Sequence, residues 1–222
     1  MALTYWSFDE ALIQTYTLPY LRLVQTNLAA GSKIYLLTLE KKHATDEVRK
    51  QRSGLKADLL ARGICWLPVN YYPYGFRALL NWVQVIVSLF FLIFLRNISI
   101  IHCWATPAGS AGYLLSLLTG RKLIIDSYEP HAEAMIENGT WKPASFAFKL
   151  LFWLEKKQTR RASVLIGVTA GMAEYAKEKY GNFHGDFYTK PACVDLGLFS
   201  RDKEQRKALN TLPGVPLVPH VP

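Results

Sequence analysis

The stretch ISIIHCWATPAGSAGYLLSLLTGRKLIID, residues 98–126, decides the fold class. An apolar run at 98–104 is followed by a helix-compatible segment at 108–119, by Gly120, and by a second apolar run at 122–126. Neither run alternates with polar residues, as is typical of strands buried on both faces of a parallel sheet. Strand, helix and strand in this order predict a right-handed crossover between parallel strands.

The same alternation extends along most of the chain. Further strands are predicted at 2–6, 33–39, 64–68, 163–169 and 187–190, and further helices at 17–30, 45–62, 76–96, 143–162 and 170–180. Thr45 is a good helix start, and helices are predicted to stop at Gly31, Gly63, Gly120 and Gly181. The pattern predicts an α/β fold with a Rossmann-like, doubly wound parallel sheet of about seven strands.

Composition limits the kind of protein and of partner. Half of the 222 residues are apolar and 19% are charged, which suits one domain with a sizeable core. The formal net charge of +9 favours an anionic partner, either acidic lipid, nucleic acid or a phosphorylated small molecule. A basic soluble domain without such a partner has the same composition. No aromatic–basic RNA-binding motif is present, so we expect no nucleic acid partner.

Cysteines and known motifs argue against several kinds of site. Cys65, Cys103 and Cys193 lie far apart in apolar stretches, which predicts reduced core thiols in a cytoplasmic protein. The sequence has no metal-ligand spacing, no G-x-G-x-x-G fingerprint, no P-loop, no G-x-S-x-G elbow and no H-E-x-x-H motif. We therefore expect neither a metal nor a cofactor. The N-terminus also lacks the basic region and cleavage site of a signal peptide.

One predicted helix is unusually apolar. Residues 78–95 are uncharged between Arg77 and Arg96, and eighteen helical residues reach about 27 Å, close to the thickness of a bilayer core. A span would place the strands at 33–39 and 98–104 on opposite sides of the membrane, although both belong in one sheet. We expect this helix to lie on the sheet, with its outer face in a membrane interface or against another subunit.

A second helix carries apolar residues at helical spacing beside a cationic cluster. The apolar residues are Phe146, Leu150, Trp153 and Leu154, and the cations are Lys156, Lys157, Arg160 and Arg161. This combination suits an anionic lipid surface. It equally suits a core-facing helix whose solvated end carries the cations that a helix C-terminus favours.

Ligands of doubly wound sheets bind beyond the carboxyl ends of the strands, and the loop after the fifth predicted strand is the richest there. Asp126, Glu129 and His131 are candidate catalytic residues, because carboxylates and a histidine can hold sugar hydroxyls or accept a proton. Glu129 and Glu133 are four residues apart, so a helical turn would place them on one face. Alternatively, Asp126 caps a turn and the others lie on the surface.

The same loop and other strand ends add candidate acceptor-binding residues. These candidates are Ser7, Asp9, Gln14, Tyr128, Glu133 and Thr169. Asp9 and Glu10 could instead cap the first helix. Small residues at 105–112 lead into a helix, where they either let a phosphate approach the helix N-terminus or allow tight packing of the helix on the sheet.

The segments IIDSYEPHAE at 124–133 and NGTW at 138–141 resemble a region of family-4-like glycosyltransferases, in which a strand ending in Asp leads into an acidic and aromatic loop. The resemblance continues through Glu155, through 161–175, and through KPACVD at 190–195 with Phe199, which looks like the hinge of that family. The run at 100–104 resembles its fourth strand. The likeness covers about residues 1–200.

The resemblance implies a GT-B fold, in which two Rossmann-like domains flank a cleft. In that family the N-terminal half binds the acceptor, the C-terminal half binds the nucleotide-sugar, and the enzymes retain anomeric configuration without a metal. Residues 1–199 would be the acceptor-side domain. Residues 200–222, with four prolines in the last ten positions, would be a hinge remnant and an extended or disordered tail.

Three features depart from the family pattern. Ala192 and Cys193 replace the Asn-Gly of the hinge. Residues 7–14 contain none of the paired glycines that often follow the first strand, and the position of a reaction-centre histidine corresponds to Tyr128, with His131 three residues later. Either residue could meet the acceptor hydroxyl.

The sequence therefore predicts half of a retaining glycosyltransferase. It would bind a glycan or lipid-linked sugar acceptor in the cytoplasm, peripherally at the inner face of the membrane, and would receive a nucleotide-sugar from a missing or separate C-terminal domain. Alone it would have very little transferase activity, because the donor diphosphate would lack its clamp. The alternatives are a non-catalytic acceptor-binding or membrane-docking module, and an integral membrane protein anchored through residues 78–95.

Overall fold

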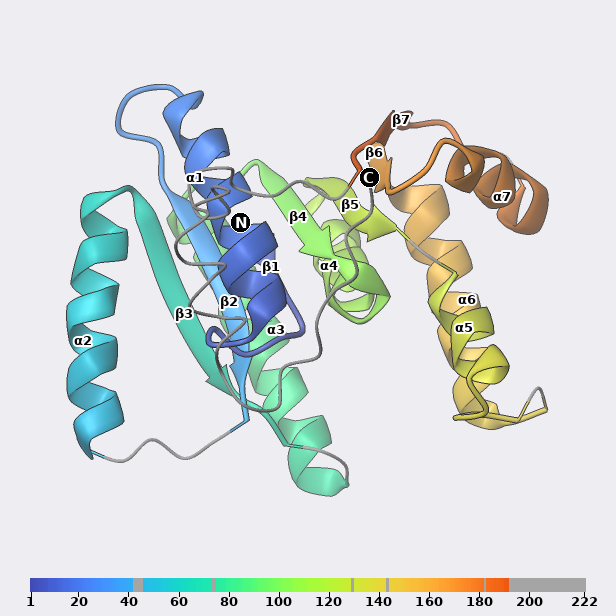
Figure 1. Ribbon diagram of the computed structural model, residues 1–222, viewed down its shortest axis with the longest axis horizontal. Coiled ribbons are helices and arrows are strands. Elements are labelled where there is room, and N and C mark those ends of the chain that lie inside the picture. The colour runs from blue at the N-terminus through green and yellow to red at the C-terminus, as the bar shows by residue number, and fades with distance from the viewer. Residues whose placement is uncertain (42–45, 73–74, 129, 143, 182, 192–222) are drawn as a thin grey trace, which may run out of the picture. The chain divides into compact units, whose positions relative to one another are not determined.

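The computed structural model describes residues 1–41, 46–72, 75–128, 130–142, 144–181 and 183–191. Its centre is a seven-stranded sheet in the order β3-β2-β1-β4-β5-β6-β7, and every paired strand is parallel to its neighbour (Figure 1). The strands are β1 (Ala2–Leu3), β2 (Ile34–Glu40), β3 (Ile64–Asn70), β4 (Ile100–Trp104), β5 (Lys122–Tyr128), β6 (Val164–Gly167) and β7 (Asp186–Thr189). The predicted α/β class and parallel sheet are confirmed.

The helices alternate with these strands as predicted, with one addition. They are η1 (Leu12–Thr17), α1 (Leu18–Thr26), α2 (Asp46–Ala61), α3 (Phe76–Leu95), α4 (Ala105–Thr119), α5 (His131–Glu137), α6 (Phe146–Arg161) and α7 (Gly171–Tyr180). The short helix α5 was not predicted as a separate element. Helix α4 follows β4 directly, because Ala105 takes a left-handed backbone conformation (φ 63°) that turns the chain without a loop.

Glycines end some helices but not all of those predicted. Gly120 adopts the left-handed conformation at the end of α4, and Gly181 follows α7. The prediction for Gly31 was wrong, because η1 and α1 begin earlier than expected and α1 already ends at Thr26. The predicted helix start at Thr45 lies outside the described residues.

Two hydrophobic cores lie on opposite faces of the sheet. On one face, Leu21 of α1 and Leu59 of α2 pack over residues such as Leu36. On the other face, Leu89 of α3 and residues of α4, α6 and α7 pack over residues such as Leu37. Adjacent strand residues point to opposite faces, so one apolar run serves both cores. Figure 1 shows α1 in front of the sheet and α3 behind it.

The apolar helix lies on the sheet, as predicted. Phe76–Leu95 is long and apolar enough to cross a membrane, with a mean hydropathy of 2.3. However, Val85, Leu89 and Ile93 are buried in the core, and the flanking strands β3 and β4 belong to the same sheet. This arrangement argues against an integral span through α3.

The remaining predictions concern the state of the cysteine thiols and the residue at which the domain ends. Cys103 is buried and Cys65 is half-buried, both are free, and burial raises the pKa of the Cys103 thiol. Met1–Ala192 forms one compact unit. Cys193, the end of the predicted domain at residue 199, and the tail at 200–222 lie outside the described residues.

Candidate functional site

The order of the strands reverses between β1 and β4, and this reversal locates the candidate site. Leu3 of β1 aligns with Leu37 of β2 on one side and with Cys103 of β4 on the other. The chain leaves β1 toward the face of α1, and it leaves β4 toward the face of α4. In such sheets a crevice opens outside the carboxyl ends of the two strands, and ligands bind there.

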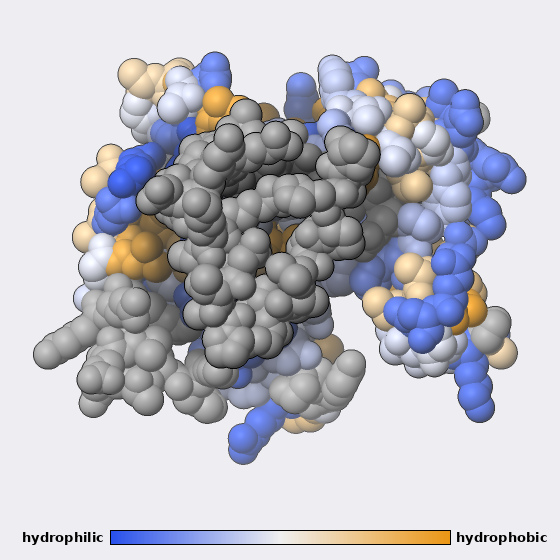
Figure 2. Space-filling model, viewed as in Figure 1, coloured by the Kyte–Doolittle hydropathy of each residue, from blue (hydrophilic) through white to orange (hydrophobic). Residues whose placement is uncertain are grey.

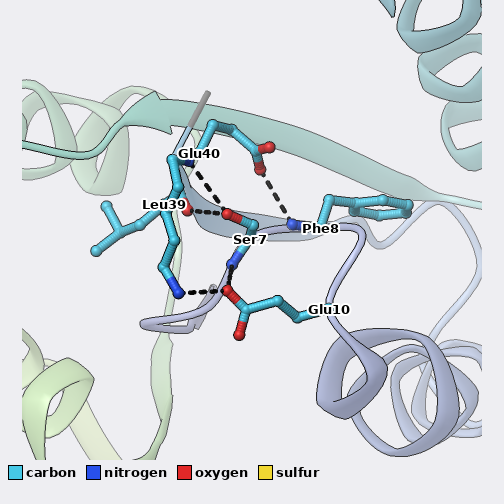
Figure 3. Close-up of polar contacts among 6 residues, drawn as sticks. Ser7, Phe8, Glu10, Leu39 and Glu40 are labelled. Atoms are coloured by element: carbon cyan, nitrogen blue, oxygen red, sulfur yellow. Dashed lines mark hydrogen bonds and ion pairs between the residues drawn. The ribbon is translucent and has the colours of Figure 1, made fainter. Parts of the chain in front are cut away.

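Ser7 fastens the loop after β1 to the end of β2 (Figure 3). Its hydroxyl donates to the Leu39 carbonyl at 2.7 Å and accepts from the Lys41 backbone N–H at 3.2 Å. Its own N–H donates to the Glu10 carboxylate, which also pairs with the Lys41 ammonium at 2.7 Å. The acceptor-binding role of Ser7 stays a prediction. Its observed hydrogen bonds hold this loop in place.

A buried carboxylate lies beneath the same loop. Glu40 accepts from the Phe8 backbone N–H at 3.1 Å (Figure 3) and from the Thr38 hydroxyl at 2.6 Å. Thr38 in turn accepts from the Trp66 indole N–H at 2.7 Å. This chain of hydrogen bonds satisfies a carboxylate that is almost fully buried, and it fixes the backbone of the loop.

Gln14 and Asp9, the other candidates of this region, differ in their surroundings. Gln14 donates from Nε2 to the Phe8 carbonyl at 2.6 Å, so it braces the loop. Asp9 lies exposed at the tip of the loop. Ala11, just before η1, makes no side-chain cap hydrogen bond. The alternative of Asp9 or Glu10 capping the first helix stays a prediction.

Asp126 lies in a buried polar cluster next to the reversal point. Its side chain is 0% exposed, accepts from His102 Nε2 at 3.2 Å, and pairs with the Lys190 ammonium. Lys190 also lies over the Tyr20 ring, 3.9 Å from its centroid, and His102 stacks on Trp104 at 3.9 Å. The cluster joins β4, β5, α1 and the segment after β7.

Burial and pairing act in opposite directions on the charges of this cluster. Burial acts to raise the pKa of Asp126, but the hydrogen bond from His102 and the charge of Lys190 outweigh it, so the pKa lies below its ordinary value. Burial lowers the pKa of His102 despite its bond to Asp126. An ionised Asp126 with a neutral His102 follows at neutral pH. The geometry favours a structural role, and the catalytic role of Asp126 stays a prediction.

The segment after β5 leads into α5, which begins at His131. His131 is half-buried at the carboxyl edge of the sheet. Tyr128 ends β5, but its side chain and Glu129 lie outside the described residues. Thr169 is exposed after β6, and its carbonyl accepts from the Met172 N–H at the start of α7.

Glu133 contacts α7 instead of the crevice. Its carboxylate accepts a hydrogen bond from the Tyr175 hydroxyl and pairs with the Lys179 ammonium at 2.8 Å. Burial acts to raise its pKa, but the bonds from Lys179 and Tyr175 hold the pKa below its usual value. The expected face shared with Glu129 lies outside the described residues.

Glu155 of α6 holds the starts of α4 and α5 together. Its buried carboxylate accepts from the Ala132 N–H at 2.9 Å and the Tyr180 hydroxyl at 3.0 Å, and it also bonds the Thr106 hydroxyl. It interacts electrostatically with His131. Because α4 and α5 follow β4 and β5, this single side chain links the chain segments that leave two neighbouring strands.

Burial raises the pKa of Glu155 above its ordinary 4.5. The folded state therefore binds the proton more readily, and stability is lost as pH rises from the unfolded pKa through the folded one. We expect Glu155→Gln, which keeps an acceptor for Ala132 without the charge, to be at least as stable as the original chain at pH 7 and to lose that advantage near pH 4. Glu155→Ala should cost about 2 kcal/mol, because buried donors lose their acceptor. Urea unfolding at both pH values measures this. Equal losses in the two variants at pH 7 would contradict it.

The small residues of α4 serve close packing at Gly112. A Cβ there would lie 2.2 Å from Cys103 Sγ and 3.0 Å from Leu123 Cδ1, both in the core. Of the two alternatives for 105–112, this geometry supports tight packing of helix on sheet.

Gly112→Ala is therefore expected to lower the free energy of unfolding by about 1–3 kcal/mol through overpacking. Gly54 of α2 is the matched control, since nothing lies within 4 Å of an added Cβ. Gly54→Ala should instead stabilise by about 0.5–1 kcal/mol through helix propensity. Chemical denaturation of both variants checks the opposite signs, and a destabilisation shared by both would count against the packing argument.

A cavity of about 550 Å³ lies at the other end of the sheet. Met1, Lys33 and Ser99 line it at the amino ends of strands. Tyr20 and His102 of the Asp126 cluster also line it. Because ligands of doubly wound sheets bind at the carboxyl ends, we do not assign the proposed ligand to this cavity.

The sequence analysis did not identify three residues that contact the predicted site residues or their loops. Glu40 and Lys190 each stand at the end of an apolar run, where a lone charge beside a buried strand is a signal that could have found them. His102 lies inside a strand, and only the register of β4 against β5 places it beside Asp126.

Comparison with solved structures shows the fold of one Rossmann-like half of GT-B glycosyltransferases. The chain is 11% identical to HepE from Anabaena, solved with UDP and glucose, with a TM-score of 0.51 over 96% of this chain and 50% of that one. It is 16% identical to sucrose-phosphate synthase from Thermosynechococcus elongatus, with a TM-score of 0.60 over 96% and 52% of the two chains. HepE with UDP-glucose aligns similarly, at 12% identity, a TM-score of 0.53, and 94% and 49% coverage. No family model and no curated protein matches the sequence. The chain spans about half the length of these structures.

Proposed function

We propose that the chain is the acceptor-side domain of a glycosyltransferase that moves a sugar from a nucleotide-sugar to a glycan or lipid-linked acceptor. The observation that carries the proposal is the fold match over 96% of this chain to half of GT-B glycosyltransferases. Fold alone does not fix function, so the proposal also draws on the crevice between β1 and β4. We place the fastened loop after β1 and His131 at the borders of this crevice.

His131 is the side chain that we place against the acceptor hydroxyl. It stands at the first position of α5, beyond the carboxyl end of β5, and the buried Glu155 carboxylate accepts a hydrogen bond from the backbone N–H of the next residue, Ala132. In the reaction, the acceptor oxygen forms a bond to the anomeric carbon while the bond from that carbon to the donor diphosphate breaks. His131 would orient the hydroxyl and accept its proton. Retention of configuration without a metal is the expectation from the sequence resemblance.

The nucleotide-sugar would be held by a second Rossmann-like domain, either on the same polypeptide or on a separate one. Without that second domain, the chain would have very little transferase activity, because no residues would bind and stabilise the donor diphosphate.

Calorimetry of the 222-residue chain tests this division. We expect no binding of UDP, GDP or their sugars, and binding of an oligosaccharide or lipid-linked sugar acceptor that protects residues 4–10 and α5 from hydrogen exchange. Micromolar binding of UDP or GDP would give the chain its own donor site and overturn the assignment. Acceptor binding without sugar transfer, once a donor-binding domain is supplied, would instead identify a non-catalytic acceptor-binding module.

A further inference from the structure

Helix α3 carries three different stripes. One is buried against the sheet and contains Val85, Leu89 and Ile93. A second is polar and contains Arg77, Asn81, Gln84 and Ser88, of which the last three line a cavity beside β3. The third is apolar and exposed, and its members are Phe76, Leu80, Val83, Val87, Phe91 and Phe94. A soluble helix needs only the first two, so the exposed apolar stripe requires a partner.

The exposed apolar stripe continues onto the next helix. Helices α3 and α4 pack side by side on the same face of the sheet, and α4 exposes Leu114, Leu117 and Leu118. Arg121, just after α4, lies over the Phe94 ring at 5.9 Å, so a cation stands at the edge of the apolar surface. We call these exposed apolar residues of α3 and α4, with Arg77, Arg96 and Arg121 at their margin, the α3–α4 surface.

The charged residues in the stretch of sequence that builds this surface all have one sign. The sequence contains no Asp or Glu between Asp58 and Asp126, and Arg77, Arg96, Arg121 and Lys122 fall within that stretch. On the face that Figure 2 shows, hydrophilic residues lie along the margin of the molecule over α7. An apolar surface with Arg77, Arg96 and Arg121 at its margin is complementary to a hydrophobic layer bordered by anions.

Helix α6 presents the same combination on a neighbouring part of the layer. Phe146, Leu150 and Trp153 are exposed at helical spacing, so the alternative that these three are core residues is wrong. Lys157 lies over the Trp153 ring at 5.6 Å. Because α6 packs against α4, its apolar stripe and cations extend the basic, apolar side of the molecule.

We propose that the α3–α4 surface docks on the interface of an anionic lipid bilayer, with α3 lying in the plane of the membrane. A second copy of the chain fits less well. Arg77 and Arg96 stand at the two ends of α3, so pairing α3 with itself in either direction brings cations together, with no acidic residue in the stretch to neutralise them. Acidic headgroups supply that neutralising charge.

The docked orientation suits the proposed function, although the docking itself does not depend on it. Helix α3 starts at the carboxyl edge of the sheet, where β3 ends, and runs back toward the amino edge where β4 begins. Its first turn therefore lies at the same edge as the crevice. If the proposed function holds, a lipid-linked acceptor in the same leaflet would reach the crevice.

Flotation of the 222-residue chain with vesicles tests the docking. We expect binding to vesicles of phosphatidylcholine containing about 30% phosphatidylglycerol, little binding to phosphatidylcholine alone, and weakening by salt. Phe91→Glu places a charge at a residue that is 57% exposed, and it should weaken binding to the anionic vesicles at least about tenfold without lowering the melting temperature. Arg96→Glu should weaken binding comparably by reversing a marginal charge.

Leu60→Glu is the matched control, because Leu60 is equally exposed but lies on α2, which packs on the other face of the sheet. It should bind like the original chain. Undiminished binding of Phe91→Glu and Arg96→Glu would overturn the proposal. So would the absence of vesicle binding together with a dimer, seen by light scattering, that Phe91→Glu dissociates, because the surface would then serve a second copy. Acceptor binding is measured separately, so failure of either proposal leaves the other testable.

Discussion

Replacing Asp126 with asparagine is expected to lower the free energy of unfolding by about 3–5 kcal/mol, the usual cost of removing one partner of a buried ion pair. The carboxylate is 0% exposed, and its removal leaves the Lys190 ammonium, itself only 15% exposed, without its counter-charge. Asparagine can still accept the hydrogen bond from His102, so the loss reports mainly on the charge. Urea unfolding at pH 7, followed by circular dichroism, measures it.

The double variant Asp126→Asn with Lys190→Met provides the control. Removing both charges should recover much of the loss, because methionine keeps packing against Tyr20 while no unpaired charge remains buried. The penalty should also depend on pH. The pKa of Asp126 is lowered in the folded state, so its contribution is present above the ordinary value of 3.8 and is lost as pH falls through the folded pKa. Equal losses in the single and double variants at pH 7 would show that the pair is not coupled.

The fold was predictable because its signal is local. Each strand of a buried parallel sheet needs a short apolar run, and each crossover needs a longer helical segment, so both can be recognised without knowing any contact. The boundaries were less predictable where tertiary contacts decide them. Helix α4 begins at Ala105 instead of 108 because a left-handed residue replaces the expected loop. Helix α5 has only seven residues after Pro130, and part of its support comes from Glu155, which lies 23 residues beyond Ala132.

The sequence predicted at which edge of the sheet the candidate site lies, but not which side chains contact each other there. The carboxyl ends of the strands follow from the topology, and Ser7, Asp126 and His131 do lie there. Their partners depend on register, which the sequence does not reveal. Lys190 is 64 residues from Asp126, and Leu39 is 32 residues from Ser7. Among the polar residues predicted as candidate ligands, Ser7 and Asp126 therefore make contacts that hold strand ends together.

His131→Ala is expected to reduce the turnover number of the assembled enzyme, this chain with its donor-binding domain, by about 10²–10⁴-fold. The reason is position: His131 is the first residue of α5, half-buried at the carboxyl edge, and the buried Glu155 fixes the backbone N–H of its neighbour Ala132. Sugar transfer at saturating donor and acceptor measures the loss. This effect would exceed that of any acceptor contact that only adds ground-state affinity.

The matched control is His184→Ala, which removes an exposed histidine between α7 and β7 and should leave turnover unchanged. A raised KM with an unchanged turnover number in His131→Ala would reduce His131 to an acceptor-binding contact, because an interaction used only to bind affects ground state and transition state alike. An unchanged turnover and an unchanged KM would remove His131 from the site. In that case the next candidates for the hydroxyl-facing group would be Tyr128, the last residue of β5, and Glu129, which follows it.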